Sequence, residues 1–113
     1  DIKAVRQKSI ELTDLFIIET RKKNPMLELI SPDKAEERGA HVSYRFKNGY
    51  AVVRCLINHG VICDFRVPDI MRFGFNPLYI NESDVRKASN ILTKILKYKK
   101  WDKPHLKQKL FVT

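Results

Sequence analysis

The chain has 113 residues, of which 43% are hydrophobic and 31% are charged, and its formal net charge is +9. This length suits one domain with a modest core and is small for a complete cofactor-dependent enzyme. No apolar run approaches the roughly 20 residues that a membrane span needs, and the charged opening does not resemble a signal peptide.

The first predicted element is a long amphipathic helix over residues 1–24, which ends at an Asn-Pro pair. The helical period places four apolar residues on one face: Ile2, Val5, Leu12 and Phe16. An apolar run over residues 26–30 predicts a short strand. Residues 31–39, SPDKAEERG, carry the Ser-Pro, charge and glycine signals of an exposed loop.

A strand and a helix are predicted next. Residues 41–46, HVSYRF, alternate as a half-buried strand does, and the side chains on the apolar side are Val42, Tyr44 and Phe46. An Asn-Gly turn follows, and residues 50–60 then predict a helix that stops at Gly60 in a left-handed cap. Its apolar residues at helical spacing are Tyr50, Val53, Leu56 and Ile57.

Two further strand candidates are VICDFRV, residues 61–67, and IMRFGF, residues 70–75. A last helix is expected to begin at Asn81 or Ser83, and a lysine-rich tail follows it. The apolar residues of this helix are Val85, Ala88, Leu92, Ile95 and Leu96. The order of elements predicts one α+β domain over residues 1–113, with a small, mostly antiparallel sheet covered by helices on one face.

The spacing of Cys55, His59 and Cys63, at intervals of four residues, raises the question of a metal site. Gly60 ends the helix between them and no fourth ligand is apparent, so we predict small buried cysteines and a helix-end histidine, not a metal site. Two cysteines are also too few for a disulfide framework, which favours a reducing, cytoplasmic setting. The chain has no serine-nucleophile elbow and no glycine-rich phosphate loop, so we assign it no catalytic residue.

Arg72 is the residue that most needs a partner, because it lies within the apolar run IMRFGFNPLY. On a strand it shares a face with Ile70 and Gly74, while the neighbouring large side chains point into the core. A guanidinium pairs well with a carboxylate through two hydrogen bonds. Spacing alone favours a local partner, Asp64 or Asp69, although the glycine on the same face leaves room for a ligand to approach.

The sequence resembles the C-terminal part of the kynureninases from residue 31 onward. The motifs that carry the resemblance are Glu37-Arg38-Gly39 before an alternating strand, Gly60-Val61-Ile62 followed by Asp64-Phe65-Arg66, Arg72-Phe73-Gly74 leading into Pro77-Leu78-Tyr79, and the terminal KLFVT. Kynureninases are fold-type-I pyridoxal-phosphate enzymes, in which a large domain carries the cofactor and a small C-terminal domain closes over the substrate. The resemblance covers only the small domain.

The resemblance implies that the full-length protein acts in tryptophan catabolism, where it hydrolyses L-kynurenine to anthranilate and L-alanine. It also implies that 3-hydroxykynurenine is a substrate, with 3-hydroxyanthranilate and L-alanine as the products. The pyridoxal 5'-phosphate lysine would lie outside this chain, so this piece alone is expected to be inactive. The helix over residues 1–24 would connect to the large domain, and the full-length enzyme is expected to be a homodimer.

By resemblance, Arg72 matches the family arginine that binds the substrate α-carboxylate, and Gly74 would keep the strand end open beside it. Asp64 and Arg66 also match family positions and are expected to support Arg72 as an ion pair. Two other matches, Arg38 and Ser43, are interpreted as structural.

Two other readings remain open. The chain could be the small domain of a related class-V aminotransferase or desulfurase, which would share the carboxylate arginine. The charge also permits a free-standing nucleic-acid-binding module, but the lysines and arginines are spread along the chain without the interleaved aromatics that stack on bases. We therefore expect neither a nucleic-acid partner nor a membrane.

Overall fold

The computed structural model describes residues 1–32 and 38–109 of the chain. The elements follow in the order α1 (Ile2–Lys23), β1 (Glu28–Leu29), β2 (His41–Arg45), α2 (Gly49–Asn58), β3 (Cys63–Arg66), β4 (Ile70–Gly74), α3 (Glu82–Lys97) and α4 (Pro104–Lys107). From α1 to α3 this is the predicted order, whereas α4 lies in the segment that was predicted to be a tail. Part of the predicted loop at 31–39 and most of the terminal KLFVT lie outside the described residues.

The four strands form one sheet in the order β1-β2-β4-β3, and each neighbouring pair is antiparallel. The alternation seen in the sequence is reproduced, since Val42 and Tyr44 of β2 and Met71 and Phe73 of β4 are all buried. The α+β class is therefore confirmed. The strand β1 is shorter than the predicted run of residues 26–30.

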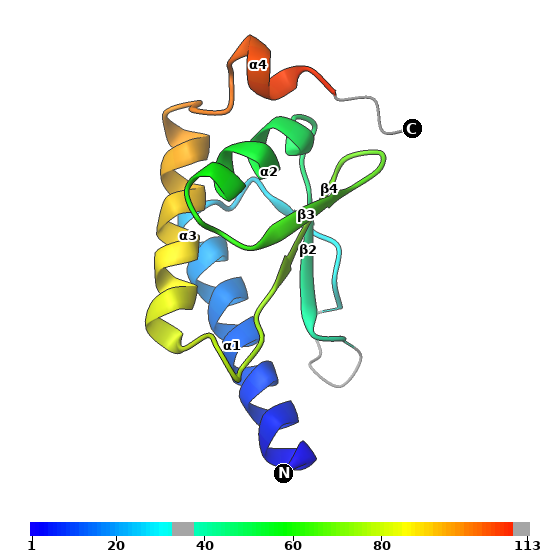
Figure 1. Cartoon of the computed structure of the whole chain (residues 1–113), viewed down its shortest axis with the longest axis vertical. Coiled ribbons are helices and arrows are strands. Elements are labelled where there is room, and N and C mark those ends of the chain that lie inside the picture. The colour runs from blue at the N-terminus through cyan, green and yellow to red at the C-terminus, as the bar shows by residue number, and fades with distance from the viewer. Residues whose placement is uncertain (33–37, 110–113) are drawn as a thin grey trace.

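All three long helices lie on the same side of the sheet (Figure 1). The helices α1 and α2 contact the strands, and α3 packs against both of them. Phe16 of α1 joins the layers, because its ring centroid lies 4.8 Å from that of Phe73 and 4.9 Å from that of Phe75. The core thus sits on one face of the sheet and leaves the other face to carry polar groups.

Two predicted helix boundaries are confirmed by their capping geometry. Asn81 caps α3, since its side chain accepts a hydrogen bond from the Asp84 backbone while the Asp84 carboxylate accepts one from Asn81. Gly60 follows α2 with φ of +85°, a conformation that glycine adopts at little cost.

The helical faces differ from the prediction at two places. In α1, Ile2 is 87% exposed and Val5 is also exposed, because helix packing begins only near Ser9. In α2, Ile57 is exposed and Tyr50 only half-buried, whereas the side chains that face the core are Ala51, Val52, Val53, Cys55 and Leu56. This helix lies between the sheet and α3, so its buried arc is wider than that of a surface helix.

The segment after α3 is more ordered than the predicted tail. It forms the short helix α4, and it buries Trp101 and Leu106 against the rest of the molecule. Trp101 also makes an edge-to-face contact with Phe46, which follows the end of β2. No helix in the described part of the chain is long and apolar enough to cross a membrane.

Candidate functional site

The candidate site lies on the sheet face opposite the helices. Cross-strand register places Arg72 of β4 directly between Ser43 of β2 and Asp64 of β3. Because side chains of paired residues point to the same side of a sheet, the three form one row across it. Arg66 and His41 lie on the same face, one on each side of this row.

Arg72 and Asp64 form a two-point ion pair. The guanidinium donates from Nε to Oδ1 of Asp64 over 3.0 Å and from Nη2 to Oδ2 over 2.7 Å. Among the described residues, Nη1 of Arg72 has no hydrogen-bond partner. One edge of the guanidinium is therefore fixed by the protein, and the other is available to a ligand.

The pair lies at the surface, because the Arg72 side chain is 27% exposed and that of Asp64 is 51% exposed. The guanidinium is thus not buried in the core, despite its apolar sequence neighbours. The hydrogen bond from Arg72 lowers the pKa of Asp64, and the charges of Arg72, Arg66 and His41 add to this effect. Exposed pairs contribute about 0 to 1 kcal/mol to stability, so this pair orients Arg72 more than it holds the fold.

The expected ion pair between Asp64 and Arg66 is present but looser. Nε of Arg66 lies 3.8 Å from Oδ1 of Asp64, and the Arg66 side chain is the more exposed of the two. Asp69, the other local carboxylate considered for Arg72, instead accepts a hydrogen bond from Nε of Arg45 over 3.2 Å. Of the two candidate partners, the structure selects Asp64.

Gly74 is not beside open space on the site face, as the sequence suggested, because His41 lies over it. A β-carbon added at Gly74 would be 3.0 Å from Cδ2 and 3.3 Å from Nε2 of the His41 ring. The glycine therefore makes room for an imidazole near Arg72. Nothing in the sequence around His41 points to this position; the antiparallel pairing of β2 with β4 brings it there.

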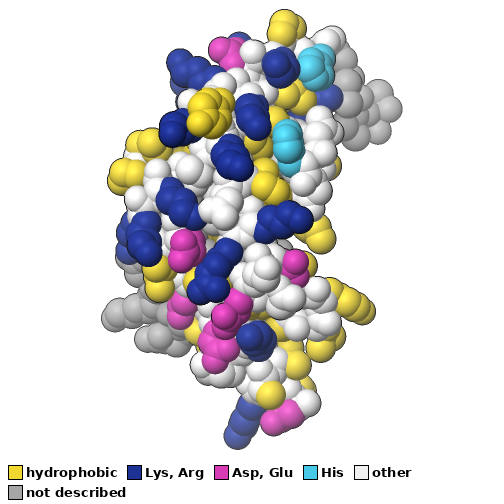
Figure 2. Space-filling model, turned by 90° about the vertical axis from the view of Figure 1, so that its left-hand side faces the viewer, with side chains coloured by type: hydrophobic (Ala, Val, Ile, Leu, Met, Phe, Trp, Pro, Cys, Tyr) yellow, Lys and Arg dark blue, Asp and Glu magenta, His cyan; other side chains and the backbone are white. Residues whose placement is uncertain are grey.

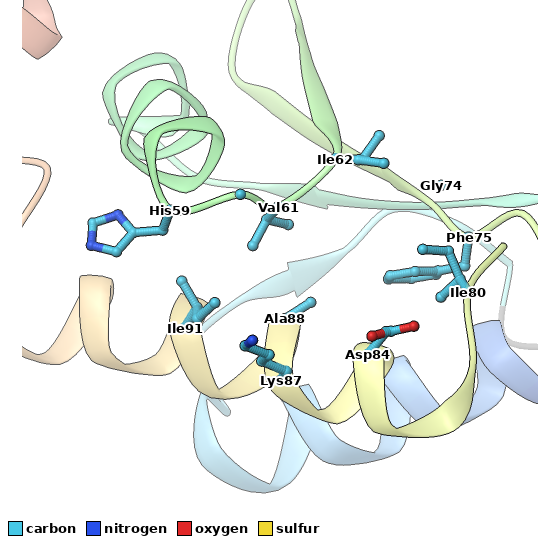
Figure 3. A pocket seen from close by; sticks show the side chains of 11 residues that line it. His59, Val61, Ile62, Gly74, Phe75, Ile80, Asp84, Lys87, Ala88 and Ile91 are labelled. Atoms are coloured by element: carbon cyan, nitrogen blue, oxygen red, sulfur yellow. The ribbon is translucent and has the colours of Figure 1, made fainter.

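Hollows do adjoin the end of β4. A cavity of about 270 Å³ lies between this strand end and α3, with His59, Asp84 and Lys87 among its lining residues (Figure 3). A wider groove of about 500 Å³ is lined by His41, Gly74, the turn at residues 76–77, and Tyr79. Tyr79 is 81% exposed, so this edge of the site presents apolar surface as well as charge.

Arg38 behaves as the structural residue that was expected. Its side chain is buried, and its guanidinium pairs with Asp14 and donates to Oγ1 of Thr13 over 3.1 Å. These contacts join the segment before β2 to α1. Arg38 therefore fixes the start of the strand that carries His41 and Ser43.

Of the two cysteines predicted to be buried, Cys55 is buried and Cys63 is only half-buried. Cys55 is buried and its Sγ lies 3.9 Å from Nδ1 of His59, while the Cys63 thiol points to the backbone carbonyl oxygens of Val53 and Val61. Burial raises the pKa of the Cys63 thiol to about 12. Within the described residues, no group of three or more histidine, cysteine or acidic side chains is arranged to hold a metal ion.

The fold is therefore that of a small α+β domain, which presents Arg72 on the sheet face away from the helices. The family model described as "Kynureninase C-terminal domain" matches residues 5–92. Kynureninase from Pseudomonas fluorescens is 48% identical over 103 residues, which cover 89% of this chain and 25% of that protein. Kynureninase from Burkholderia mallei is 40% identical over 115 residues, covering 100% of this chain and 28% of that protein.

The chain therefore belongs to the kynureninase C-terminal domain family. It spans about a quarter of the length of the curated relatives that it matches.

Proposed function

We propose that this chain is the C-terminal domain of a kynureninase, and that Arg72 binds the α-carboxylate of the substrate. The full-length protein would hydrolyse L-kynurenine to anthranilate and L-alanine. The observation that carries this proposal is the two-point contact by which Asp64 fixes the guanidinium while leaving Nη1 free of partners among the described residues. Membership of the kynureninase family supports L-kynurenine as the ligand.

Pyridoxal phosphate would be held by the rest of the polypeptide. This chain's described residues do not fit the cofactor, because they offer no buried lysine beside a buried carboxylate: Lys87 and Asp84, which line the enclosed cavity, are both exposed on α3. Asp84 is also occupied in the cap of that helix. We therefore assign no cofactor contact to this chain and expect it to be inactive alone.

The contribution of this chain is to position the substrate. A carboxylate held at two points by a planar guanidinium cannot rotate freely, so the bonds at the neighbouring carbon keep a defined direction. Asp64 acts as a positioning residue, because it prevents the guanidinium from turning when no substrate is present. Arg66 adds positive charge beside Asp64, which favours the approach of an anion.

The test is the substitution Arg72→Lys in the full-length enzyme. Lysine keeps the charge but loses the planar group that makes two parallel hydrogen bonds. We expect a loss of about 2 to 4 kcal/mol in transition-state stabilisation, so kcat/KM for L-kynurenine should fall roughly 30- to 1000-fold. The matched control is Arg66→Lys, an arginine on the same face that contacts Asp64 only loosely, and it should change kcat/KM by less than about threefold. Near-normal kinetics in a destabilised Arg72→Lys enzyme would contradict the proposed role.

Product analysis separates this proposal from the small domain of a related aminotransferase or desulfurase, since only a kynureninase releases anthranilate and alanine together. We also propose that the full-length enzyme is a cytoplasmic homodimer that accepts 3-hydroxykynurenine. Light scattering on the purified full-length protein tests the homodimer, a parallel assay with the hydroxylated substrate tests its acceptance, and cell fractionation tests the cytoplasmic location.

A further inference from the structure

A further cavity lies away from Arg72, where the end of α2 meets the segment that follows α3. Its volume is about 390 Å³. Its polar lining consists of Asn58, His59, Lys100, Lys103 and His105, and Cys55 and Leu106 complete the wall. Figure 2 shows lysine and arginine side chains, together with histidines, gathered over the upper part of the molecule.

The charge of this cavity is one-sided. Among the described residues that line it, none carries a carboxylate. Residues 94–109 contain seven lysines and one acidic residue, Asp102, and Asp102 is paired with Lys107. The charges of Lys100 and Lys103 reach Cys55 in the cavity wall. Burial raises the pKa of the Cys55 thiol, and these two charges lower it. An anion entering the cavity would therefore meet an uncompensated positive field.

The walls of the cavity are held by the fold. Arg54 of α2 donates from Nη1 to the carbonyl oxygen of His105 over 2.7 Å and to that of Gln108 over 3.0 Å. Leu106 is buried between these two contacts. On the other side, Nδ1 of His59 lies 2.8 Å from the carbonyl oxygen of Cys55, which fixes the imidazole. The cationic groups thus project from an anchored frame and not from a loose tail.

We propose that this cavity is an anion site for a phosphate group, either inorganic phosphate or a phosphate monoester. Phosphate has several acceptor oxygens and close to two negative charges at neutral pH, so it can accept from the lysines of one wall and from the side-chain amide of Asn58 on the other. Binding also relieves the repulsion between the two ammonium groups. The site does not depend on the role proposed for Arg72.

The test is a titration of the 113-residue chain with inorganic phosphate, followed by 1H–15N NMR at pH 7 and at constant ionic strength set with sodium chloride. Saturable shifts are expected at the backbone amides of Asn58, His59, Lys100 and Lys103. The double variant Lys100→Gln/Lys103→Gln should bind phosphate at least about tenfold more weakly. The matched control, Lys94→Gln/Lys97→Gln, removes the same charge from the last turn of α3 and should bind as the unmodified chain does.

Three results would overturn the proposal. The first is a set of shifts that do not saturate, and the second is an equal loss of affinity in both double variants, which would show a diffuse attraction to the whole basic surface. The third is tight binding of an RNA oligonucleotide that both double variants weaken alike, which would favour a nucleic-acid surface instead. Repeating the titration with a phosphate monoester distinguishes the two sources of the phosphate group.

Discussion

Asp64→Asn is the substitution that tests how the site is built. The asparagine keeps the shape of the side chain but replaces one acceptor oxygen by the NH2 group of an amide, which only donates. Asp64 accepts from both Nε and Nη2 of Arg72, so one of these donors must face the new NH2 group, whichever way the amide is turned. The variant therefore loses one of two hydrogen bonds and the whole ionic attraction.

The cost to the fold should be small. With half of the Asp64 side chain exposed, water screens the pair, and the free energy of unfolding should fall by less than about 1 kcal/mol. The loss should depend on pH. Because Arg72 lowers the pKa of Asp64 in the folded state, the stabilisation is present above the unfolded pKa of about 3.9 and disappears as the pH falls through the lower folded pKa. The unmodified chain and the variant should therefore converge in strong acid.

The cost to function should be larger than the cost to stability. In the full-length enzyme the released guanidinium can turn, so kcat/KM for L-kynurenine should fall about tenfold or more. The control is Asp69→Asn, which removes the ionic attraction of this carboxylate for Arg45 of β2 and should leave kcat/KM unchanged. Urea unfolding between pH 2 and 7 and steady-state kinetics supply the two measurements. A loss above about 2 kcal/mol in stability with unchanged kinetics would show that Asp64 serves the fold alone.

Three other outcomes follow from the packing. Gly74→Ala should displace the His41 imidazole and lower the unfolding free energy by under about 1 kcal/mol, as thermal melts and the His41 NMR signals would show; unchanged signals would contradict the close approach. Thr20→Val should lower the free energy of unfolding by about 1 to 3 kcal/mol, because it leaves the buried Ser89 hydroxyl without the partner that lies 3.2 Å away. Adding Ser89→Ala should restore part of that loss, and purely additive effects of the two substitutions would argue against the contact. Alkylation of Cys63 at pH 8 should be far slower in the folded chain than in urea, because its pKa of about 12 leaves little thiolate, and equal rates would refute this.

The sheet and its buried face could be predicted, because a strand with one buried face shows a simple alternation of apolar and polar residues. Val42 and Tyr44 alternate with polar neighbours, and such a period leaves one face for the core. The faces of α1 and α2 were harder to predict. Ile2 continues the apolar period of α1, but whether an apolar residue is buried depends on whether a neighbouring element reaches it, and in this chain none of the described elements buries Ile2.

The partner of Arg72 could not be chosen from the sequence, because Asp64 and Asp69 both precede it closely enough to pair with it. Strand register decides the matter. The pairing of β3 with β4 places Asp64 directly opposite Arg72, whereas Asp69 precedes β4 and reaches Arg45 on β2. A shift of one residue in this register would have moved Asp64 to the core face, so the site depends on the turn between the two strands. His41 entered the site by the same route, through the register of β2 with β4.

The two roles considered for Arg72, a local ion pair and a substrate contact, are compatible in this geometry. Asp64 occupies Nε and one hydrogen of Nη2, which leaves the second hydrogen of Nη2 and both hydrogens of Nη1 for another carboxylate. The local charges also permit it, since Arg72, Arg66 and Asp64 sum to one positive charge. An arriving carboxylate therefore need not displace Asp64. The carboxylate would bind to a guanidinium that Asp64 already holds in one orientation. The guanidinium would therefore lose its conformational entropy when the chain folds, and binding would not incur that cost again.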